Sequence, residues 1–327
     1  MIMSAKVNLY CCGGTGINIG KHFEQFRDKP VTGFANLIPC YVDTSRSNSR
    51  DMAEQHVYHL EGLDGNGKLR SQNTQAITES VLSILNQFKP TEFNIVLHSA
   101  GGGSGSTIGP TIVCELLSRD VAVFVVMVGS TESVIELNNT IKTIKTYEAV
   151  SRVRKKPVAV SYYENAQGLS SRNTVNQDVR SFITLMSLLL SKQNEEMDTA
   201  DIKNWLNYHL VTSYQPKLTL LTVDTSEFAG MKDVEATAVA TISSGNMETS
   251  YDSMVEYHTV GFVQESIFKD INRTKAIHLS MLYNAWDKIH ANLKTAMDEV
   301  TAKQAARVSR SNILSKDDEV TDNGLVF

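Results

Sequence analysis

The sequence predicts an α/β fold in which a doubly wound parallel sheet is followed by a long central helix, a smaller α+β part and an extended acidic tail. Three observations lead to this prediction. Short apolar runs alternate with stretches of helical periodicity over residues 7–162. Residues 121–128, VAVFVVMV, are apolar without interruption, as in a central strand that is covered on both faces. Glycine-rich segments follow two of the apolar runs, and parallel sheets bind ligands at the carboxyl ends of their strands.

Composition narrows the class of protein. The chain has 327 residues, 42% of them hydrophobic, which suffices for one large domain or two ordinary ones. No apolar run approaches bilayer length and the first residues lead directly into a strand pattern, so we expect neither a membrane segment nor a signal peptide. The four cysteines and eight histidines have no metal-like or disulfide-like spacing, which favours a reducing cytoplasm without a protein metal site. The net charge is −5 and the basic residues are scattered, so direct nucleic-acid binding is not expected.

The first half of the chain supplies the elements of the parallel sheet. Apolar runs predict strands at residues 7–12, 38–42, 93–98, 121–128 and 157–162. The intervening segments predict helices from the glycines at 13–20 through Phe26, at 72–88, from the next glycine run to about 118, and at 134–150. In the second of these helices the apolar side chains recur with helical spacing at Ile77, Val81, Ile84, Leu85 and Phe88.

After residue 170 the pattern changes. Residues 174–190 predict a long helix, and an acidic turn then leads into a second helix that ends near Leu210. Strands of a smaller sheet are expected at 217–223, 234–242, 256–263 and 276–283, although the last of these also suits a helix. A long amphipathic helix at 284–310 and an acidic tail at 311–327 complete the chain.

The segment around which these elements are organised is residues 93–110, FNIVLHSAGGGSGSTIGP. Glycines let backbone N–H groups turn inward without an obstructing Cβ, and a cluster of amides at a helix N-terminus binds phosphate. Pro110 suits the first turn of the following helix, where a missing N–H costs nothing. A flexible surface loop is the alternative, and it is less favoured because the small residues lie directly between a strand and a helix.

Two other glycine-rich segments compete as the phosphate-binding motif. Residues 13–20, GGTGINIG, resemble a dinucleotide-binding turn, and Asp43 follows the second strand where a ribose-binding acid would lie. The glycine spacing fails, however, because Ile19 stands at the third required position. Residues 62–68 fit the pattern G-x-x-x-x-G-K, but Leu69 replaces the Ser or Thr that would hold Mg²⁺, so we favour a solvated turn for Lys68.

The segment at 101–106 contains no lysine. We therefore expect a lysine-free cradle in which backbone amides and small hydroxyls hold the phosphates and Mg²⁺ keeps much of its water shell. Two amide clusters at the ends of two parallel strands, together with residues 65–67, indicate a triphosphate that is bound from several sides.

In combination these motifs resemble the tubulin/FtsZ superfamily of GTPases. GGGSGS at 101–106 is similar to its GGGTGSG signature, and GGTGIN at 13–18 is similar to its first phosphate loop. MDTADI at 197–202 resembles the loop that carries its catalytic acids. VGSTES at 128–133, the single long helix near the end of the chain and the tail DDEVTDNGLVF at 317–327 resemble the phage-encoded tubulins of the PhuZ group. The resemblance covers nearly the whole chain.

The resemblance implies which residues form the site. Asp198 and Asp201 would be the catalytic acids, and Asn165 and Asn176 occupy guanine-reading positions. The resemblance implies that the ligand is GTP or GDP, with Mg²⁺ held through phosphates and water. The residues that it implies for binding this ligand are Gly13, Gly14, Thr15, Gly16, Asn18, Asp43, Gly65, Asn66, Gly67, Gly101, Gly102, Gly103, Ser104, Gly105, Ser106, Asn138, Asn165, Arg172 and Asn176.

Three positions depart from the pattern of the superfamily. Thr107 replaces the last glycine of the signature, and Glu196 stands where the acidic loop usually has Asn. Arg172 replaces an aromatic residue that commonly stacks on guanine, and a guanidinium plane can also stack. Lys68 is beside the loop that is expected to sense the γ-phosphate, where it could add charge.

The spacing of the two acids alone does not establish catalysis. Asp198 and Asp201 are three residues apart, so they can face the same side at the start of a helix. Asp198 suits an N-cap equally well, with Asp201 stabilised by the helix dipole. It is the resemblance that favours catalysis over capping.

The resemblance also implies how the protein works. The acidic loop would lie opposite the nucleotide and complete the site of the next copy in a head-to-tail stack, so GTPase activity would be activated by polymerisation. The filaments would position phage DNA in the cytoplasm of the infected bacterium. An NAD(P)-dependent oxidoreductase is the alternative, prompted by the near-match at residues 14–20 and by Asp43. A binding module without hydrolysis is a third possibility, which Asp198 and Asp201 disfavour.

The expected organisation has four parts. Residues 1–170 form the GTP-binding domain, 171–195 the connecting helix, 196–310 the C-terminal activation domain and 311–327 the tail. The tail is either a solvated end or a segment that docks on a neighbouring copy through its acids and its apolar terminus. Candidate receptors are the basic side chains of the long helix, namely Lys294, Lys303, Arg307 and Arg310.

Overall fold

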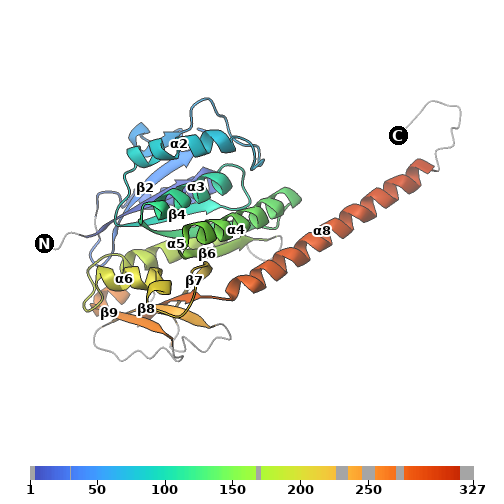
Figure 1. Ribbon diagram of the computed structural model, residues 1–327. Helices are drawn as coiled ribbons and strands as arrows, with labels where there is room; N and C mark the ends of the chain where they lie inside the picture. Colours follow the sequence, from blue (N-terminus) through green and yellow to red (C-terminus); the bar gives the residue numbers. More distant parts are fainter. Residues whose placement is uncertain are drawn as a thin grey trace.

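The strands form one ten-stranded sheet in the order β3-β2-β1-β4-β5-β6-β7-β10-β8-β9 (Figure 1). The computed structural model describes the backbone of residues 4–29, 31–166, 171–225, 235–244, 255–269 and 276–316, and the side chains of these residues except 269 and 307–316. The strands within these ranges are β1 (Lys6–Cys12), β2 (Asn36–Asp43), β3 (Val57–His59), β4 (Phe93–Ser99), β5 (Ala122–Ser130), β6 (Val158–Asn165), β7 (Leu218–Asp224), β8 (Ala236–Ser244), β9 (Tyr257–Val263) and β10 (Ala276–Leu282).

The helices cover both faces of the parallel part of this sheet. They are α1 (Gly13–Glu24), α2 (Thr74–Gln87), α3 (Gly105–Ser118), α4 (Val134–Arg154), α5 (Arg172–Leu189), α6 (Thr199–Leu206), α7 (Glu265–Lys269) and α8 (Ala285–Lys316), with single 3-10 turns η1 (Glu54–His56) and η2 (Tyr208–Leu210). Side chains of α1, α5 and α6 belong to one buried cluster, and those of α2, α3, α4 and α8 to another. The predicted α/β class with a doubly wound parallel sheet is therefore confirmed.

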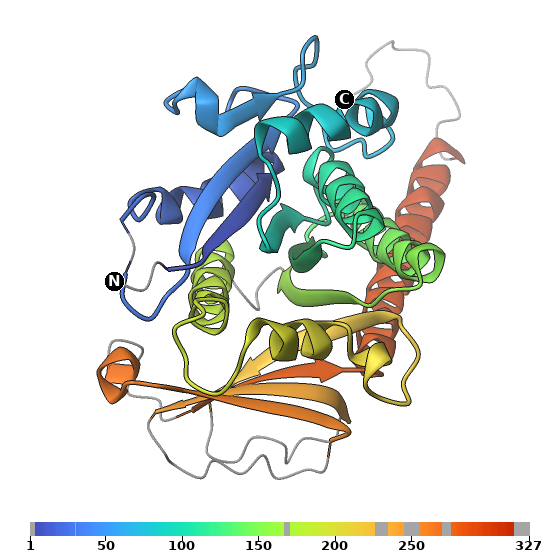
Figure 2. The ribbon, with the colours of Figure 1, turned by 60° about the vertical axis from the view of Figure 1, so that its left-hand side comes forward.

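Alternate residues of the inner strands enter opposite clusters. In β1, Leu9 and Cys11 pack with α1 and α5, whereas Tyr10 and Cys12 pack on the other face. Both faces are buried, which explains why these strands are apolar without alternation. Figure 2 shows α5 between the blue strands of the N-terminal half and the orange strands of the C-terminal half.

The C-terminal strands differ from the prediction in how they pair. A smaller separate sheet was expected, but β7 pairs in parallel with β6, at Val158 with Leu218 and Val160 with Leu220. β10 is antiparallel to both β7 and β8, so the direction of the sheet changes there. The apolar pattern identifies strands but not their neighbours, because the pairing partner is distant in sequence. Residues 276–282 form a strand and not a helix.

The final helix is longer than predicted. α8 continues to Lys316, so the first six residues of the expected tail, 311–316, are helical, and the remainder at 317–327 lies outside the described residues. Trp286 and Leu293 anchor the start of α8 in the cluster that contains α4, whereas residues 301–306 are all exposed. The N-terminal end of α8 therefore packs on the body of the molecule, and its C-terminal end projects away from it (Figure 1). No helix in the described part of the chain is both long and apolar enough to span a bilayer.

Candidate functional site

A cavity of about 370 Å³ lies at the carboxyl ends of the parallel strands β1, β2, β4, β5 and β6. It is lined by most of the predicted site residues, namely Gly13, Gly14, Thr15, Asn18, Asp43, Gly102, Gly103, Ser104, Gly105, Asn165, Arg172 and Asn176. These residues come from segments that are more than 160 positions apart in sequence, between Gly13 and Asn176. The parallel topology brings them together because it aligns the strand ends at one edge of the sheet.

Two helices begin side by side at this cavity. β1 leads into α1 at Gly13, and the glycine run leads into α3 at Gly105. A Cβ added at Gly13 would lie 2.7 Å from the backbone N of Gly105, and the φ angle of Gly13 is +69°. Glycine is therefore required at Gly13 both by its backbone conformation and by the close approach of the two helices.

Neither of these two helices has a side-chain cap. The N-cap residues Cys12 and Ser104, both within the described chain, accept no hydrogen bond from their helices through the side chain. By contrast, α4, α5 and α6 are capped by the side chains of Ser133, Ser171 and Asp198. The first N–H groups of α1 and α3 therefore remain available, and a helix N-terminus attracts an anion.

The glycine run at 101–105 forms another wall of the cavity. A network of hydroxyl groups connects this run to the loop at 65–70. The Oγ atoms of Thr44 and Ser104 are 2.6 Å apart, and the Thr44 hydroxyl donates to Asn66 Oδ1 at 3.1 Å. Asn66 is 2% exposed and donates through Nδ2 to the carbonyl of Gln72 at 2.6 Å. Asn66 thus organises the wall from behind instead of lining the cavity.

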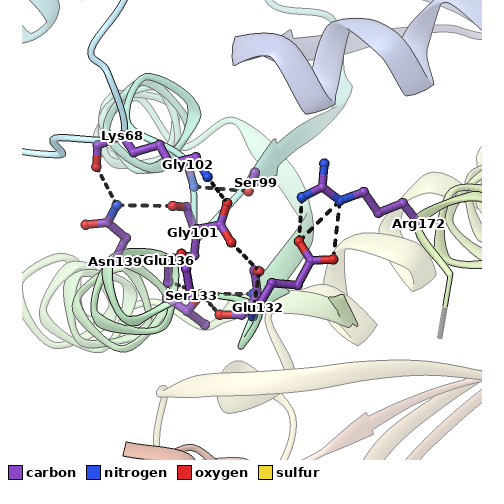
Figure 3. A network of polar contacts seen from close by, with 11 residues as sticks. Lys68, Ser99, Gly101, Gly102, Glu132, Ser133, Glu136, Asn139 and Arg172 are labelled. Carbon is purple, nitrogen blue, oxygen red and sulfur yellow. Dashed lines mark hydrogen bonds and ion pairs between the residues drawn. The ribbon is translucent and has the colours of Figure 1, made fainter. Parts of the chain in front are cut away.

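Two ion pairs face the cavity (Figure 3). Lys68 Nζ is 2.8 Å from Glu136 Oε1, and the Arg172 guanidinium binds the carboxylate of Glu132 through Nε at 3.2 and 3.4 Å and through Nη2. Burial raises the pKa of Glu136, but the hydrogen bonds from Lys68 and Ser130 outweigh it and hold that pKa below its usual value. Hydrogen bonding to Glu132 raises the pKa of Arg172.

Asp43 is a buried carboxylate at the end of β2. It is 3% exposed and accepts a hydrogen bond from the backbone N of Thr44 at 2.8 Å. Burial raises its pKa, although hydrogen bonds from Thr44, Ser104 and Asn48 oppose the rise. Asp43 therefore places an acceptor beside the two helix N-termini.

Two asparagines of β6 and α5 also line the cavity. Asn165 ends β6, and Asn176 lies in the first two turns of α5. The Oδ1 atom of Asn165 is buried and has no hydrogen-bond partner in the described structure. A buried acceptor without a donor is costly, so this atom suits a ligand that supplies an N–H.

The other predicted binding residues lie outside the cavity lining. Gly16 is buried under Leu97, Ser106 donates to the carbonyls of Gly102 and Gly103, and Gly101 packs against Ser130 and Glu136. Gly65 and Gly67 have positive φ angles in the loop that precedes α2. Asn138 donates to the Val134 carbonyl within α4, whereas its neighbour Asn139 reaches the glycine run.

The structure adds residues that sequence reasoning did not select. Those that line the cavity are Cys12, Ser45, Asn48, Lys68, Ser99, Ser130, Glu132 and Glu136. Lys68 is part of the cavity wall and not only a solvated turn, so the cavity as a whole contains a lysine, whereas the expectation that backbone amides and small hydroxyls hold the phosphates stays a prediction. The partial G-x-x-x-x-G-K pattern was the available signal, but the partner of Lys68 is 68 positions away and carries no local signature.

Pro110 lies deeper in its helix than predicted. It is in the second turn of α3, so its missing N–H leaves the carbonyl of Ser106 without the usual helical donor. Arg70 supplies one, with Nε 3.3 Å from that carbonyl, and its Nη2 donates to Thr146 Oγ1 on α4 at 2.7 Å. Arg70 therefore compensates for a proline in the interior of the helix.

The acidic residues lie at the opposite edge of the sheet. The backbone N of Ala5, just before β1, donates to the carbonyl of Ser191, and Lys192 pairs with Glu92, just before β4. These contacts place the 191–198 segment at the amino ends of the strands. α5 connects the two edges, and a helix of its 18 residues is about 27 Å long.

Asp198 and Asp201 form a reciprocal capping box at the start of α6. Asp198 Oδ1 accepts from the backbone N atoms of Ala200 at 2.7 Å and Asp201 at 3.0 Å, and Asp201 Oδ2 accepts from the backbone N of Asp198 at 3.0 Å. The capping role weighed in the sequence is therefore present. Asp198 is nevertheless exposed, and Glu196 beside it is exposed with a φ angle of +74°.

Comparisons with known proteins identify relatives over the full length of the chain. No protein-family model matches. The phage tubulin-like protein of Pseudomonas phage phiKZ is 28% identical over 344 aligned positions, covering 100% of each chain. The solved protofilament of TubZ from bacteriophage PhiKZ has a TM-score of 0.82 at 25% identity and covers 98% of this chain and 96% of its own. The GDP structure of the phage tubulin PhuZ has a TM-score of 0.82 at 23% identity, with 99% and 96% covered.

These relatives decide between the alternatives that the sequence left open. The dinucleotide-dependent oxidoreductase is not supported, because the full-length relatives are tubulin-like and both glycine-rich segments line one cavity. The chain is therefore similar over its whole length to phage tubulin-like proteins, in agreement with its resemblance to the tubulin/FtsZ superfamily.

Proposed function

We propose that the protein is a GTPase that polymerises head to tail into filaments and hydrolyses GTP where two copies meet. The observation that carries this proposal is the separation of two kinds of site. Two uncapped helix N-termini meet at Gly13 and Gly105 in one cavity, while Asp198, which is exposed, and Asp201, which is half-buried, lie at the other edge of the sheet. A phosphate ligand suits the first site, and the second presents acidic side chains.

The phosphate end of the cavity consists of backbone donors. The first turns of α1, at Gly13–Thr15, and of α3, at Gly105 and Ser106, together with the glycine run, would hold the phosphates of GTP or GDP. Mg²⁺ would be held through phosphates and water, since this ion keeps most of its hydration shell in such sites.

The other end of the cavity suits guanine. Asn165 Oδ1 is a buried acceptor without a donor, and guanine carries donors at its ring N–H and its 2-amino group. Asn18, Asn176 and Arg172 also line the cavity, where they would complete the contacts to base and ribose. The phage tubulin PhuZ, which has the same fold, was solved with GDP.

Distance and exposure support hydrolysis between copies. With α5 about 27 Å long between the two edges, Asp198 does not reach the cavity of its own chain. A heterologous contact between the cavity of one copy and the acidic loop of the next does not close, so it produces a filament. There the carboxylates of Asp198 and Asp201 would position and polarise the attacking water. The related TubZ of phiKZ forms a protofilament.

The cellular role and the tail complete the proposal. The filaments would position phage DNA in the cytoplasm of the infected bacterium, and residues 317–327 would dock on an adjacent copy through their acids and apolar end. Lys294 and Lys303 are exposed on α8 and remain candidate receptors, while the side chains of Arg307 and Arg310 lie outside the described residues. The expected division of the chain after residues 170, 195 and 310, into a GTP-binding domain, a connecting helix, an activation domain and a tail, remains part of this proposal.

Turnover measured against protein concentration tests hydrolysis between copies. GTP turnover per chain is expected to rise with concentration and to disappear on dilution. Asp198→Asn retains an N-cap but removes the charge, so we expect normal GTP binding and GTP-dependent sedimentation, with turnover reduced at least about 100-fold. Asp178→Ala, an exposed acid on α5 outside both sites, is the control and should hydrolyse normally. Turnover per chain that does not depend on concentration would refute the proposal.

Truncation tests the tail. Removal of residues 317–327 leaves α8 complete to Lys316 and should abolish GTP-dependent sedimentation without changing GTP affinity. Because the contact is charged, full-length filaments should also weaken as salt is raised. Normal sedimentation of the truncated chain would exclude tail docking.

A further inference from the structure

Lys68 lies in the cavity wall, a position that the partial G-x-x-x-x-G-K pattern at 62–68 indicated only weakly. Its Nζ is 2.8 Å from Glu136 Oε1, and the side chains of the two residues are 55% and 11% exposed. The lysine is thus the accessible partner of the pair, and the carboxylate is the buried one.

The backbone of Lys68 is fixed independently of its side chain. Asn139 Nδ2 donates to the Lys68 carbonyl at 2.8 Å and to the Gly101 carbonyl at 3.1 Å, so one side chain joins the loop to the glycine run (Figure 3). A Cβ added at Gly103 would lie 3.2 Å from the Cα of Lys68, which shows how closely the loop lies on that run. The Lys68 ammonium can therefore change its partner without movement of the backbone.

Glu136, in contrast, is held on several sides. It lies in the first turn of α4, its Oε2 accepts from Ser130 Oγ at 3.0 Å, and its backbone N donates to the cap Ser133 Oγ at 3.3 Å. Its pKa is below the usual value, so it is an anion at neutral pH. A fixed anion next to a mobile cation holds that cation away from other ligands until a stronger anion enters.

We propose that Lys68 selects a triphosphate over a diphosphate by exchanging Glu136 for the terminal phosphate. This inference rests on the proposed function, because it assumes that the cavity binds a nucleotide. Lys68 is anchored on the glycine run, which is the phosphate end of the cavity, so an added phosphate group competes with Glu136 for the same ammonium. A phosphate carries more charge than a carboxylate, and the third phosphate is the group by which a triphosphate extends beyond a diphosphate, so we expect the triphosphate to displace Glu136 and the diphosphate to leave the ion pair intact.

Calorimetric titration with GDP and with guanosine 5′-(β,γ-imido)triphosphate, which resists hydrolysis, tests the exchange. We expect Lys68→Asn to weaken triphosphate binding about tenfold and GDP binding less than about twofold, because one charge-assisted contact is lost. Asn tolerates the left-handed backbone of Lys68, whose φ angle is +64°, so this variant should keep the loop conformation. Lys68→Arg should restore most of the preference.

Glu136→Gln provides the second arm. In the wild-type background it should tighten triphosphate binding by several-fold, since Lys68 is released. In the Lys68→Asn background the gain in triphosphate affinity should be smaller. This difference separates the exchange of partners by Lys68 from direct repulsion between Glu136 and the phosphate. Arg172→Gln is the matched control, because it breaks the other cation–carboxylate pair of the cavity and should weaken both nucleotides equally.

The outcomes separate the two levels of the proposal. If the wild-type protein binds neither nucleotide, the proposed function fails. If it binds both and Lys68→Asn, folded by circular dichroism, keeps the wild-type preference, the exchange is excluded while the proposed function stands. A loss of preference in Arg172→Gln equal to that in Lys68→Asn would also overturn the assignment to Lys68. Equal gains from Glu136→Gln in both backgrounds would do the same.

Discussion

The two edges of the sheet carry polar sites of opposite construction. At the carboxyl edge, backbone amides and buried side chains form a cavity, and the helices α1 and α3 begin without side-chain caps. At the amino edge, the functional candidates are side chains: Asp198 caps α6 and is exposed, and Asp201 is half-buried. In the described structure, the first N–H groups of α1 and α3 have no side-chain acceptor from their N-cap residues, whereas the carboxylates of Asp198 and Asp201 already accept hydrogen bonds from the first turn of α6.

This difference is the reason why, under the proposed function, a single chain is not expected to form a complete site for GTP hydrolysis. The cavity has the features needed to bind a phosphate ligand, since its donors are fixed by the fold. At the acidic loop, Asp198 caps α6 through Oδ1 while its side chain remains exposed. Substitutions at the two edges should therefore have separable effects on binding, stability and turnover.

The largest effect is expected at the meeting point of α1 and α3. Gly13→Ala would place a Cβ 2.7 Å from the backbone N of Gly105 in a left-handed conformation, so we expect nucleotide affinity to fall at least about 100-fold. Gly62→Ala is the matched control, because Gly62 also has a positive φ angle of +73° but no atom within 4 Å of the added Cβ. It should bind nucleotide normally. Equal losses in both variants would assign the effect to backbone strain alone.

The cavity edge should also lose stability at low pH. His98 in β4 is fully buried, Nε2 is 2.7 Å from Tyr147 Oη, and burial lowers its pKa from 6.5 to about 4. The folded state disfavours protonation of His98. The contribution of neutral His98 to the free energy of unfolding is therefore fully present above pH 6.5, the unfolded-state pKa, and is lost as the pH falls below that value. By pH 5 the free energy of unfolding should be about 2 kcal/mol lower.

Urea unfolding of the wild-type protein and of His98→Gln at pH 7 and pH 5 measures this contribution. Gln does not titrate in this range, so the variant should lose less stability between the two pH values, even if it is less stable at pH 7. Identical losses in the two proteins would show that His98 does not contribute.

A smaller effect is expected at the acidic edge. Asp198→Ala removes the N-cap of α6 and should lower the free energy of unfolding by about 1 kcal/mol, whereas Asp198→Asn retains a cap and should lower it much less. Both variants should lose turnover under the proposed function. Thermal unfolding separates the two roles, and a normal GTPase rate in Asp198→Ala would leave only the capping role.

The smallest effect is expected at Glu92. This residue pairs with Lys192 and Lys203 on either side of the acidic loop, and all three side chains are at least one-third exposed. Exposed ion pairs contribute little, so Glu92→Gln should change the free energy of unfolding by less than about 1 kcal/mol, and the change should vanish in 1 M salt. Urea unfolding at low and high salt measures it, and a change of several kcal/mol that persists in salt would contradict this view of the amino edge.

Local patterns predicted the architecture of the cavity edge. Strand, glycine run and helix follow one another within a few residues at Gly13 and at Gly101, so backbone chemistry alone indicates a phosphate site. The alternation of such units predicted the parallel sheet. The capping geometry of Asp198 and Asp201 was also readable from their spacing.

What the sequence did not predict depends on contacts between distant residues. The pairing of Lys68 with Glu136, the compensation of Pro110 by Arg70 and the addition of β7 to the edge of β6 each join segments more than 30 positions apart. Side-chain type and periodicity carry no information about such partners, because they are selected by topology. The extension of α8 to Lys316 was also not predicted.

The proline in α3 has a mechanical consequence. Because Arg70 replaces the missing helical donor at the Ser106 carbonyl and also binds Thr146, the 65–70 loop is joined to α3 and α4 at once. α4 in turn packs against the base of α8, the helix that extends away from the body. A displacement of this loop would either break the hydrogen bonds of Arg70 or move α4 with it. The contacts of Arg70 therefore connect the cavity mechanically to α4 and, through α4, to α8.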